Sequence, residues 1–404
     1  MTLDANRLLA ACGDDSFEAG IAIKAELEPL GGSGAPVKPS VYAGGVYQLD
    51  RRWRGNGGER RPVDAVVIDN VPSQANRLEA ALRGVREQLR LPEIILDLAQ
   101  AGPLPPHLPE RLSSFQFPHR QADAYLRDAM MSPDQDFVKS EVGVALFAAS
   151  ADAPLALLEW FPQALLFGFW QSHLGKKRSQ AKLARSWVSE IVGYDPAASE
   201  TRQLGLKGDP LNLSIDESVV YDENDVAEWH LSAEARQASG SKPKDKRAKK
   251  EKLSKIGHGQ VPVSGTDAAL AGISFAEVEQ QATVSFAALR RLHLDTAEQS
   301  AAMRALLVAL GLVAHVHAFG RSFSLRSGCE LRAQSTSWTW LGEDSDEALE
   351  PLGREAATEL FQQCVAEAER VSLPVGRSWP DDPLVVQPKE DLIKAIKSTY
   401  PVES

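Results

Sequence analysis

Several cations in this chain lie beside hydrogen-bonding side chains at places that suit an anion. Asn76 and Arg77 stand where a helix would begin, directly after an apolar strand at residues 65–68. Backbone amides and the helix dipole favour negative charge at such a start, so a phosphate group fits there. The alternative is that both side chains cap the helix and pair with Glu79 or Glu87. This segment alone does not decide between the two interpretations.

A second basic group has helical spacing. His119, Asp123 and Arg127 follow one another at intervals of four, and Arg120 precedes Arg127 by seven. A helix over residues 119–129 would set them along one face. Such a stripe can follow phosphates and sugars, with Asp123 orienting Arg127 or His119. A structural helix held by ion pairs is equally consistent with the pattern.

Aromatic residues precede a basic run in the third group. Bases stack on aromatic faces while cations neutralise phosphates, so residues 167–185 predict a groove for a single strand of nucleic acid. Phe167 is expected in the core, and Glu190 is expected to hold Arg185 through a charge-assisted pair. The candidate contacts are Trp170, Ser172, Lys176, Lys177, Arg178, Lys182 and Arg185.

Two later segments add candidates. Arg326 alternates with Leu325 on a strand predicted over residues 322–331, so it should face away from the core, toward RNA or a partner, unless it is ordinary surface charge. His258 stands between two glycines after a lysine-rich run, and we expect a flexible tip there. The cations of the run are Lys242, Lys244, Lys246, Arg247, Lys249, Lys250, Lys252 and Lys255.

Catalytic and metal-binding patterns are weak. His315 and His317 bracket one residue, and no third ligand stands at a metal-site spacing, so we expect no metal. No cofactor motif or nucleophile motif is recognised, and we predict no cofactor, no catalytic residue and no enzyme activity. The alternative is a ribonuclease that uses His119, His173 or His258.

Composition limits the possible partners. The 404 residues are 43% hydrophobic, enough for a substantial core, and the formal charge is -11. A net negative surface excludes indiscriminate nucleic-acid binding, so any RNA contact must be local. The acidic residues of 343–350 could meet a basic face of a neighbouring subunit, or they form a solvated loop.

The cellular compartment is inferred from the cysteines and from the expected absence of a signal peptide. The three cysteines Cys12, Cys329 and Cys364 are far apart, which favours a reducing cytoplasm. We expect no signal peptide, no segment long enough to span a bilayer and no membrane association.

The coarse pattern of elements is mixed. Strands are expected at residues 18–27, 65–68 and 322–331, a loop at 51–61, and helices from 72 and at 275–292, 296–312 and 351–371. This is an α+β class. We predict one elaborated domain from residues 1–194 and 264–380, a polar, lysine-rich mobile insertion at 195–263, and a peripheral C-terminal tail at 381–404.

Five polar strings in this framework carry a family resemblance. They are residues 69–79 (DNVPSQANRLE), 119–128 (HRQADAYLRD), 165–172 (LLFGFWQS), 185–193 (RSWVSEIVG) and 325–331 (LRSGCEL). In this order they resemble the backbone subunit of type I-G (formerly I-U) CRISPR Cascade complexes, the GSU-type Csb family of the Cas-seven superfamily.

This resemblance implies a fold and a function. The fold would be a hand-like Cas-seven fold with an RRM or ferredoxin-like core and large insertions. Copies would stack head to tail along a CRISPR guide RNA, and the guide would select target DNA by base pairing. The insertion at 195–263 would be a thumb-like element or would contact DNA through its lysine-rich run, and His258 would lie in a loop near the guide. Other implied partners are the fused Cas-five/Cas-six subunit and the large subunit, and no catalytic role follows. A scaffold that binds no nucleic acid remains the other alternative, because the net charge is negative.

Overall fold

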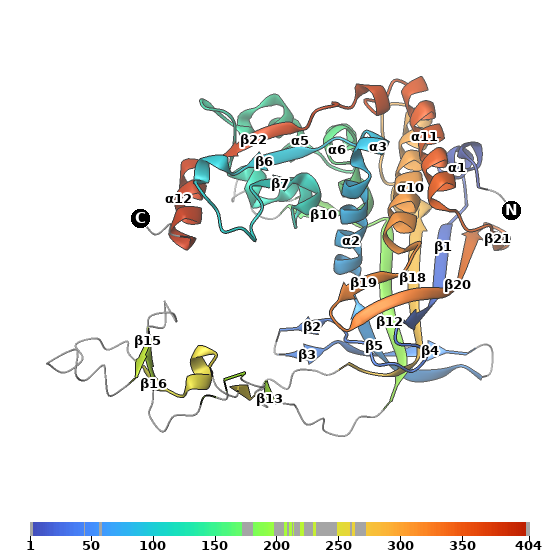
Figure 1. The fold of residues 1–404 in the computed structure, drawn as a ribbon. Coiled ribbons are helices and arrows are strands. Elements are labelled where there is room, and N and C mark those ends of the chain that lie inside the picture. Colours follow the sequence, from blue (N-terminus) through green and yellow to red (C-terminus); the bar gives the residue numbers. More distant parts are fainter. Residues whose placement is uncertain are drawn as a thin grey trace. The chain divides into compact units, whose positions relative to one another are not determined.

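The computed structural model divides the chain into two compact units (Figure 1). The first unit comprises Met1–Ser40, Leu49–Pro196 and Ser274–Ser404, and the second comprises Val41–Gln48 and Ala197–Ile273. The structure describes residues 3–43, 45–55, 59–171, 181–197, 206–207, 210–211, 213, 219–221, 229–231, 249–258, 261–262 and 272–400.

An eight-stranded antiparallel sheet organises the first unit, in the order β19-β20-β1-β18-β12-β5-β4, with β21 paired to β20. Strand β1 lies between β18 and β20, and β12 flanks β18 on its other side. With α2 before β12 and α10 after β18, this is the βαββαβ connectivity of a ferredoxin-like core. The α+β prediction is therefore confirmed. The elements of this core are β1 (Gly20–Pro29), α2 (Val71–Gly84), β12 (Trp187–Pro196), β18 (Phe275–Ser285), α10 (Ala297–Phe319) and β20 (Cys329–Leu341).

Three insertions interrupt this core. The hairpin β4 (Leu49–Arg54) and β5 (Arg61–Asp69) lies between β1 and α2 and extends the sheet beyond β12. The second insertion lies between α2 and β12, and most of the second unit lies between β12 and β18. The remaining strands of the large sheet are β19 (Phe323–Arg326) and β21 (Glu347–Leu349).

A second sheet, of five strands, is built largely from the insertion after α2. Its order is β7-β6-β22-β8-β9. The middle strand, β22, comes from the segment 381–404, which corrects the expectation of a peripheral tail: apolar Val386 of this strand is fully buried. The strands are β6 (Ile94–Asp97), β7 (Arg111–Ser113), β8 (Ala129–Ser132), β9 (Gln135–Asp136) and β22 (Leu384–Pro388).

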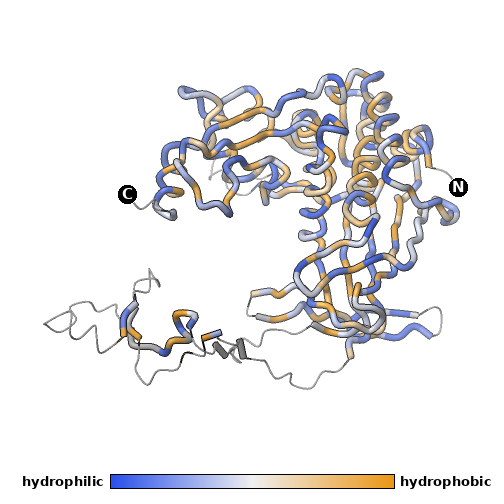
Figure 2. Tube along the Cα trace, in the orientation of Figure 1, coloured by the Kyte–Doolittle hydropathy of each residue, from blue (hydrophilic) through white to orange (hydrophobic). Residues whose placement is uncertain are grey.

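Helix α10 is the centre of the core. It packs against α2 and α11, and its residues share one apolar cluster with Ile23 of β1 and Trp338 of β20. Figure 2 shows hydrophobic residues along this helix. The expectation that no segment reaches membrane-spanning length is wrong, because α10 has 23 residues and a mean hydropathy of 1.7 over its most apolar window. Of that window, 89% is buried inside the fold, as in the core helix of a globular protein.

The other helices of the first unit are short, apart from α11. They are α1 (Ala5–Ala11), α3 (Arg86–Leu89), α4 (Ala124–Arg127), α5 (Glu141–Ala148), α6 (Leu155–Trp160), α7 (Pro162–Phe167), α9 (Phe286–Leu289), α11 (Arg354–Arg370) and α12 (Glu390–Thr399).

Three sequence-based expectations about elements are wrong. The helix expected at 275–292 is the strand β18 followed by the short α9, because pairing with β1 and β12 on both sides overrides a composition that favours helix. The loop expected at 51–61 contains most of β4. The single strand expected at 322–331 is the hairpin β19–β20, which turns at Gly328 with a φ of 75°.

Among the residues of the second unit that the structure describes are short paired strands and the 3₁₀ helix Leu253–Ile256. β14 pairs with both β15 and β16, β13 pairs with β17, and β2 pairs with β3. Their bounds are β2 (Val41–Tyr42), β3 (Val46–Tyr47), β13 (Leu206–Lys207), β14 (Val219–Tyr221), β15 (Trp229–Leu231), β16 (Lys249–Glu251) and β17 (Val261–Pro262).

Candidate nucleic-acid interface

A surface groove of about 560 Å³ gathers several of the predicted site residues. Its walls come from the end of α7, the turn at Pro118–Arg120, the start of β12 and the paired strands β10 (Phe169–Gln171) and β11 (Ala181–Leu183). Among the lining residues are His119, Arg120, Trp170, Lys182 and Arg185. The fold thus brings three separate polar strings of the sequence to one place.

The hairpin β10–β11 presents an aromatic ring and a cation side by side. Trp170 pairs with Lys182 across the two strands, so both side chains stand on the same face. Trp170 is 60% exposed, whereas Phe169 and Leu183 point the other way into the core. An exposed indole beside an ammonium group is the combination that stacks a base and neutralises a phosphate.

Gly168 allows the hairpin to leave α7 sharply. Its φ is 72°, and a Cβ at this position would lie 2.6 Å from the Leu183 carbonyl oxygen. A larger residue would therefore push β11 away from α7. This glycine fixes the position of Lys182 relative to the buried part of the fold.

Arg185 is the second exposed cation of the groove. It makes no hydrogen bond or ion pair with any residue in the part of the chain that the structure describes. Partial burial and the nearby Arg120 guanidinium lower the pKa of Arg185, and the Glu79 carboxylate opposes them. The expectation that Glu190 holds Arg185 is wrong: Glu190 pairs with Arg52 of the neighbouring hairpin, where Arg52 Nη2 donates at 3.0 Å.

Arg120 contributes to the floor of the groove, but its side chain is buried and makes internal contacts. Arg120 Nε and Nη2 donate to the two carboxylate oxygens of Glu79 at 2.8 and 2.9 Å, and Nη1 donates to the Gly168 carbonyl at 2.9 Å. Both side chains of the pair are buried. The structure therefore contradicts the surface stripe in which Arg120 contacts phosphates. This guanidinium supports the groove from inside.

The helix expected over residues 119–129 is broken. Residues Arg120–Ala122 form a 3₁₀ turn, and Asp123 is extended and caps α4. Asp123 accepts hydrogen bonds from the backbone N–H groups of His119 and Tyr125, so it does not orient Arg127. Arg127 pairs instead with Asp128, and it does not line the groove, whereas His119 is exposed at its rim.

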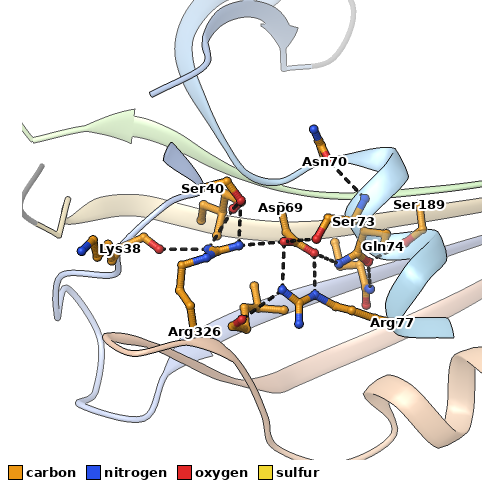
Figure 3. A network of polar contacts seen from close by, with 12 residues as sticks. Lys38, Ser40, Asp69, Asn70, Ser73, Gln74, Arg77, Ser189 and Arg326 are labelled. Carbon is orange, nitrogen blue, oxygen red and sulfur yellow. Dashed lines mark hydrogen bonds and ion pairs between the residues drawn. The ribbon is translucent and has the colours of Figure 1, made fainter. Parts of the chain in front are cut away.

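Arg77 and Arg326 meet at one buried carboxylate (Figure 3). Asp69 Oδ1 accepts from Arg326 Nη2 at 2.8 Å, and Asp69 Oδ2 accepts from Arg77 Nε at 2.8 Å. Arg326 also donates to the carbonyls of Lys38 and Ile68, and Arg77 to that of Leu325. These contacts tie the start of α2 to the hairpin β19–β20. Arg326 was predicted to face away from the core, toward RNA or a partner; in the structure it is half-buried and engaged by Asp69.

The remaining predicted residues are scattered. Asn76 is exposed on α2, whose N-cap is Asn70. In the second unit His258 is exposed with its ring 5.6 Å from that of Trp229, Lys252 and Lys255 are exposed, and Lys249 and Lys250 belong to β16. Outside the described residues lie Ser172, His173, Lys176, Lys177, Arg178, Lys242, Lys244, Lys246 and Arg247.

The face of the large sheet opposite the helices does not resemble the stacking platform of an RRM, in which aromatic residues on the sheet receive bases. Neighbouring strands carry ion pairs there: Arg52 with Glu190, and Lys24 and Arg54 with Glu279. These groups neutralise one another. Base stacking in this part of the structure is therefore better served by Trp170 than by the sheet.

Two residues of this region were not site candidates in the sequence analysis: Val188, which lines the groove, and Glu79, which is buried and is not among the lining residues. Val188 is 43% exposed although its neighbours Trp187 and Ser189 are buried. The alternation of a strand predicts one outward residue here, so the signal was available. Glu79 had been considered as a partner of Arg77, and nothing in the sequence spacing links it to Arg120, 41 residues away.

A comparison with models of protein families gives a match for part of the chain. Residues 21–197 match the family model described as CRISPR-associated protein GSU0053 (Cas_GSU0053). The matched segment includes α2, β12, all of β1 except its first residue, and every residue that lines the groove. It supports a role for the chain in CRISPR systems. No curated protein matches the chain.

Proposed function

We propose that the chain is the guide-RNA-binding backbone subunit of a type I-G CRISPR Cascade complex. The observation that carries the proposal is the groove in which exposed Trp170 stands beside Lys182 and Arg185. The match of residues 21–197 to a CRISPR-associated family supports the same assignment. The groove would hold a single strand by stacking and by charge, without reading its sequence.

The charge distribution fits this task. The chain as a whole carries a formal charge of -11, so it repels nucleic acid except where cations are concentrated. Lys182 and Arg185 are exposed at the groove, and Arg120 beneath it is already neutralised by Glu79. Local attraction within a negative surface favours one defined path for RNA over nonspecific coating.

The proposal assigns no catalytic role and no cofactor to this subunit, and it places the protein in the cytoplasm with copies of itself, the fused Cas-five/Cas-six subunit and the large subunit as partners. Target DNA would be contacted through the guide. In the ribonuclease alternative, His119 would be the general base. Alanine at His119, His173 and His258 would then abolish cleavage of repeat RNA, and unchanged RNA processing in this triple variant would exclude that alternative.

The direct test is expression of the chain with a CRISPR array, followed by the ratio of absorbance at the nucleic-acid and protein maxima and sequencing of bound RNA. The proposal predicts uniform, repeat-derived RNA in a high-mass complex. Protein that stays free of RNA when the other subunits are also expressed would contradict it, and it would favour the scaffold alternative.

A further inference from the structure

A second surface with nucleic-acid chemistry lies on the hairpin β4–β5, away from the groove. A cavity of about 860 Å³ opens there, among the residues around the hairpin end and the C-terminal part of β12. The lining residues that carry the argument are Lys24, Trp53, Arg54, Arg60, Arg61 and Tyr194. Val188 lines the groove and Tyr194 lines this cavity, so the two sites are separated by roughly 20 Å along β12.

Trp53 is the exposed aromatic residue of this cavity. It belongs to β4, the edge strand of the large sheet, and is 62% exposed. Tyr194, by contrast, is buried beneath the guanidinium of Arg54, which lies 4.2 Å from the ring centroid. A largely exposed indole is typical of a binding surface, where tryptophan is enriched.

The cations of the cavity divide into two classes. Arg54 and Lys24 are neutralised by Glu279, and Arg54 also by Glu277. Arg60 and Arg61 are exposed and make no ion pair with the residues that the structure describes. Glu59 is the exposed acidic neighbour. Two guanidinium groups thus remain available for an anionic ligand next to the exposed indole.

We propose that the hairpin β4–β5 is a second binding surface for single-stranded nucleic acid, in which Trp53 stacks on a base and Arg60 and Arg61 contact phosphates. Arg54 and Tyr194 form its floor. An acidic peptide would satisfy the two arginines, but it would leave the indole without a stacking partner, whereas a single strand supplies both contacts. The inference does not require the groove to bind the guide.

The test uses the full chain and a variant that removes the groove, W170A/K182E/R185E. Binding of fluorescein-labelled oligo(dT) and oligo(U) of about 12 nucleotides, a length within the usual site size of single-strand-binding surfaces, is measured by anisotropy at several salt concentrations. The groove variant should retain weak binding. Adding R60E/R61E should weaken it at least about tenfold and reduce the salt slope by about 1.4, since each lost phosphate contact contributes roughly 0.7.

The matched control is R83E/R321E, which reverses two exposed arginines on other elements, and it should leave the residual binding unchanged. Ultraviolet crosslinking should place an oligonucleotide adduct on the peptide that contains Trp53. Equal effects of R60E/R61E and the control, or no residual binding in the groove variant, would overturn the proposal. Residual binding of polyglutamate in place of the oligonucleotides would also overturn it, in favour of an acidic protein partner. None of these results decides whether the groove of the wild-type protein binds RNA, so the two proposals fail independently.

Discussion

Arg120 and Glu79 form a bidentate ion pair directly beneath the groove, with N–O distances of 2.8 and 2.9 Å. Glu79 belongs to α2, and Arg120 also holds the carbonyl of Gly168, from which the hairpin β10–β11 departs. One buried guanidinium therefore connects α2 to the hairpin that carries Trp170. The position of the aromatic ring depends on this internal contact.

The Arg120→Met variant should lose about 3–5 kcal/mol of unfolding free energy, because it leaves the Glu79 carboxylate buried without its cation. Burial already raises the pKa of Glu79, and the Arg120 guanidinium opposes that effect. The double variant E79L/R120M should recover much of the loss, since no unpaired charge remains. Urea denaturation measures the unfolding free energy of the single and the double variant. A single variant as stable as the wild type would show that this pair does not support the fold.

In the groove, Trp170→Ala should weaken binding of a single RNA strand by about 1–3 kcal/mol, the usual contribution of one stacked base. Trp170→Phe should retain part of that affinity, because it keeps an aromatic face. Unfolding free energy should change little in either variant, since the ring is 60% exposed. Anisotropy titrations with a labelled guide segment give the affinities. Equal affinity of the wild type and Trp170→Ala would remove this residue from the RNA path.

Asp69→Asn should act on stability, because two arginines share that buried carboxylate. The expected loss is about 3 kcal/mol, as for other buried pairs deprived of one partner. The exposed Asp50, which pairs with Arg52, provides the control: Asp50→Asn should cost less than about 1 kcal/mol. The unfolding free energies of the Asp69→Asn and Asp50→Asn variants are compared by thermal and urea denaturation. Loss of RNA affinity in Asp69→Asn without loss of stability would mean that Arg77 and Arg326 serve the RNA directly.

His315 should make the fold sensitive to mild acid. The imidazole is fully buried against Trp187 and Trp338, and burial lowers the pKa of His315 to about 4. The unfolded chain, with a histidine pKa near about 6.5, then binds the proton more readily, so stability is full above that pH and falls between about 6.5 and 4. The expected contribution is about 3 kcal/mol over this interval.

The difference between the wild type and His315→Phe isolates this effect from the titration of carboxylates. Unfolding free energies measured at several pH values should fall less steeply for the variant between pH of about 6.5 and 4. Parallel curves for the two proteins would show that His315 is not held neutral in the folded state.

Local patterns in the sequence predicted the elements with clear periodicity. The spacing of apolar residues after Pro72 identified α2, and the alternation of apolar residues from residue 18 identified β1. Strand β18 was missed because Gln280 occupies an inward position, where its amide donates to Gln74, and the expected apolar alternation is interrupted. A polar residue in the core satisfies its hydrogen bonds through tertiary contacts that no local pattern contains.

The candidate site was also predicted only in part, because local composition contains no information about tertiary contacts. Aromatic and basic composition identified Trp170, Lys182 and Arg185, which do line one groove. Composition does not distinguish an unpaired arginine from one that pairs with a buried carboxylate, so Arg120, Arg77 and Arg326 were predicted to contact RNA. Their carboxylate partners, Glu79 and Asp69, become neighbours only when the sheet and α2 are assembled.

The central claim is that the groove beside β10–β11 holds the guide RNA. The most direct measurement is the amount of repeat-derived RNA that co-purifies, per protein chain, with the wild type, with W170A/K182E/R185E and with the control R83E/R321E, each expressed with the same CRISPR array and partner subunits. If the groove holds the guide, the groove variant should lose most of this RNA while it remains folded, and the control should keep it. Wild-type levels of guide RNA in the folded groove variant would show that the guide is held elsewhere.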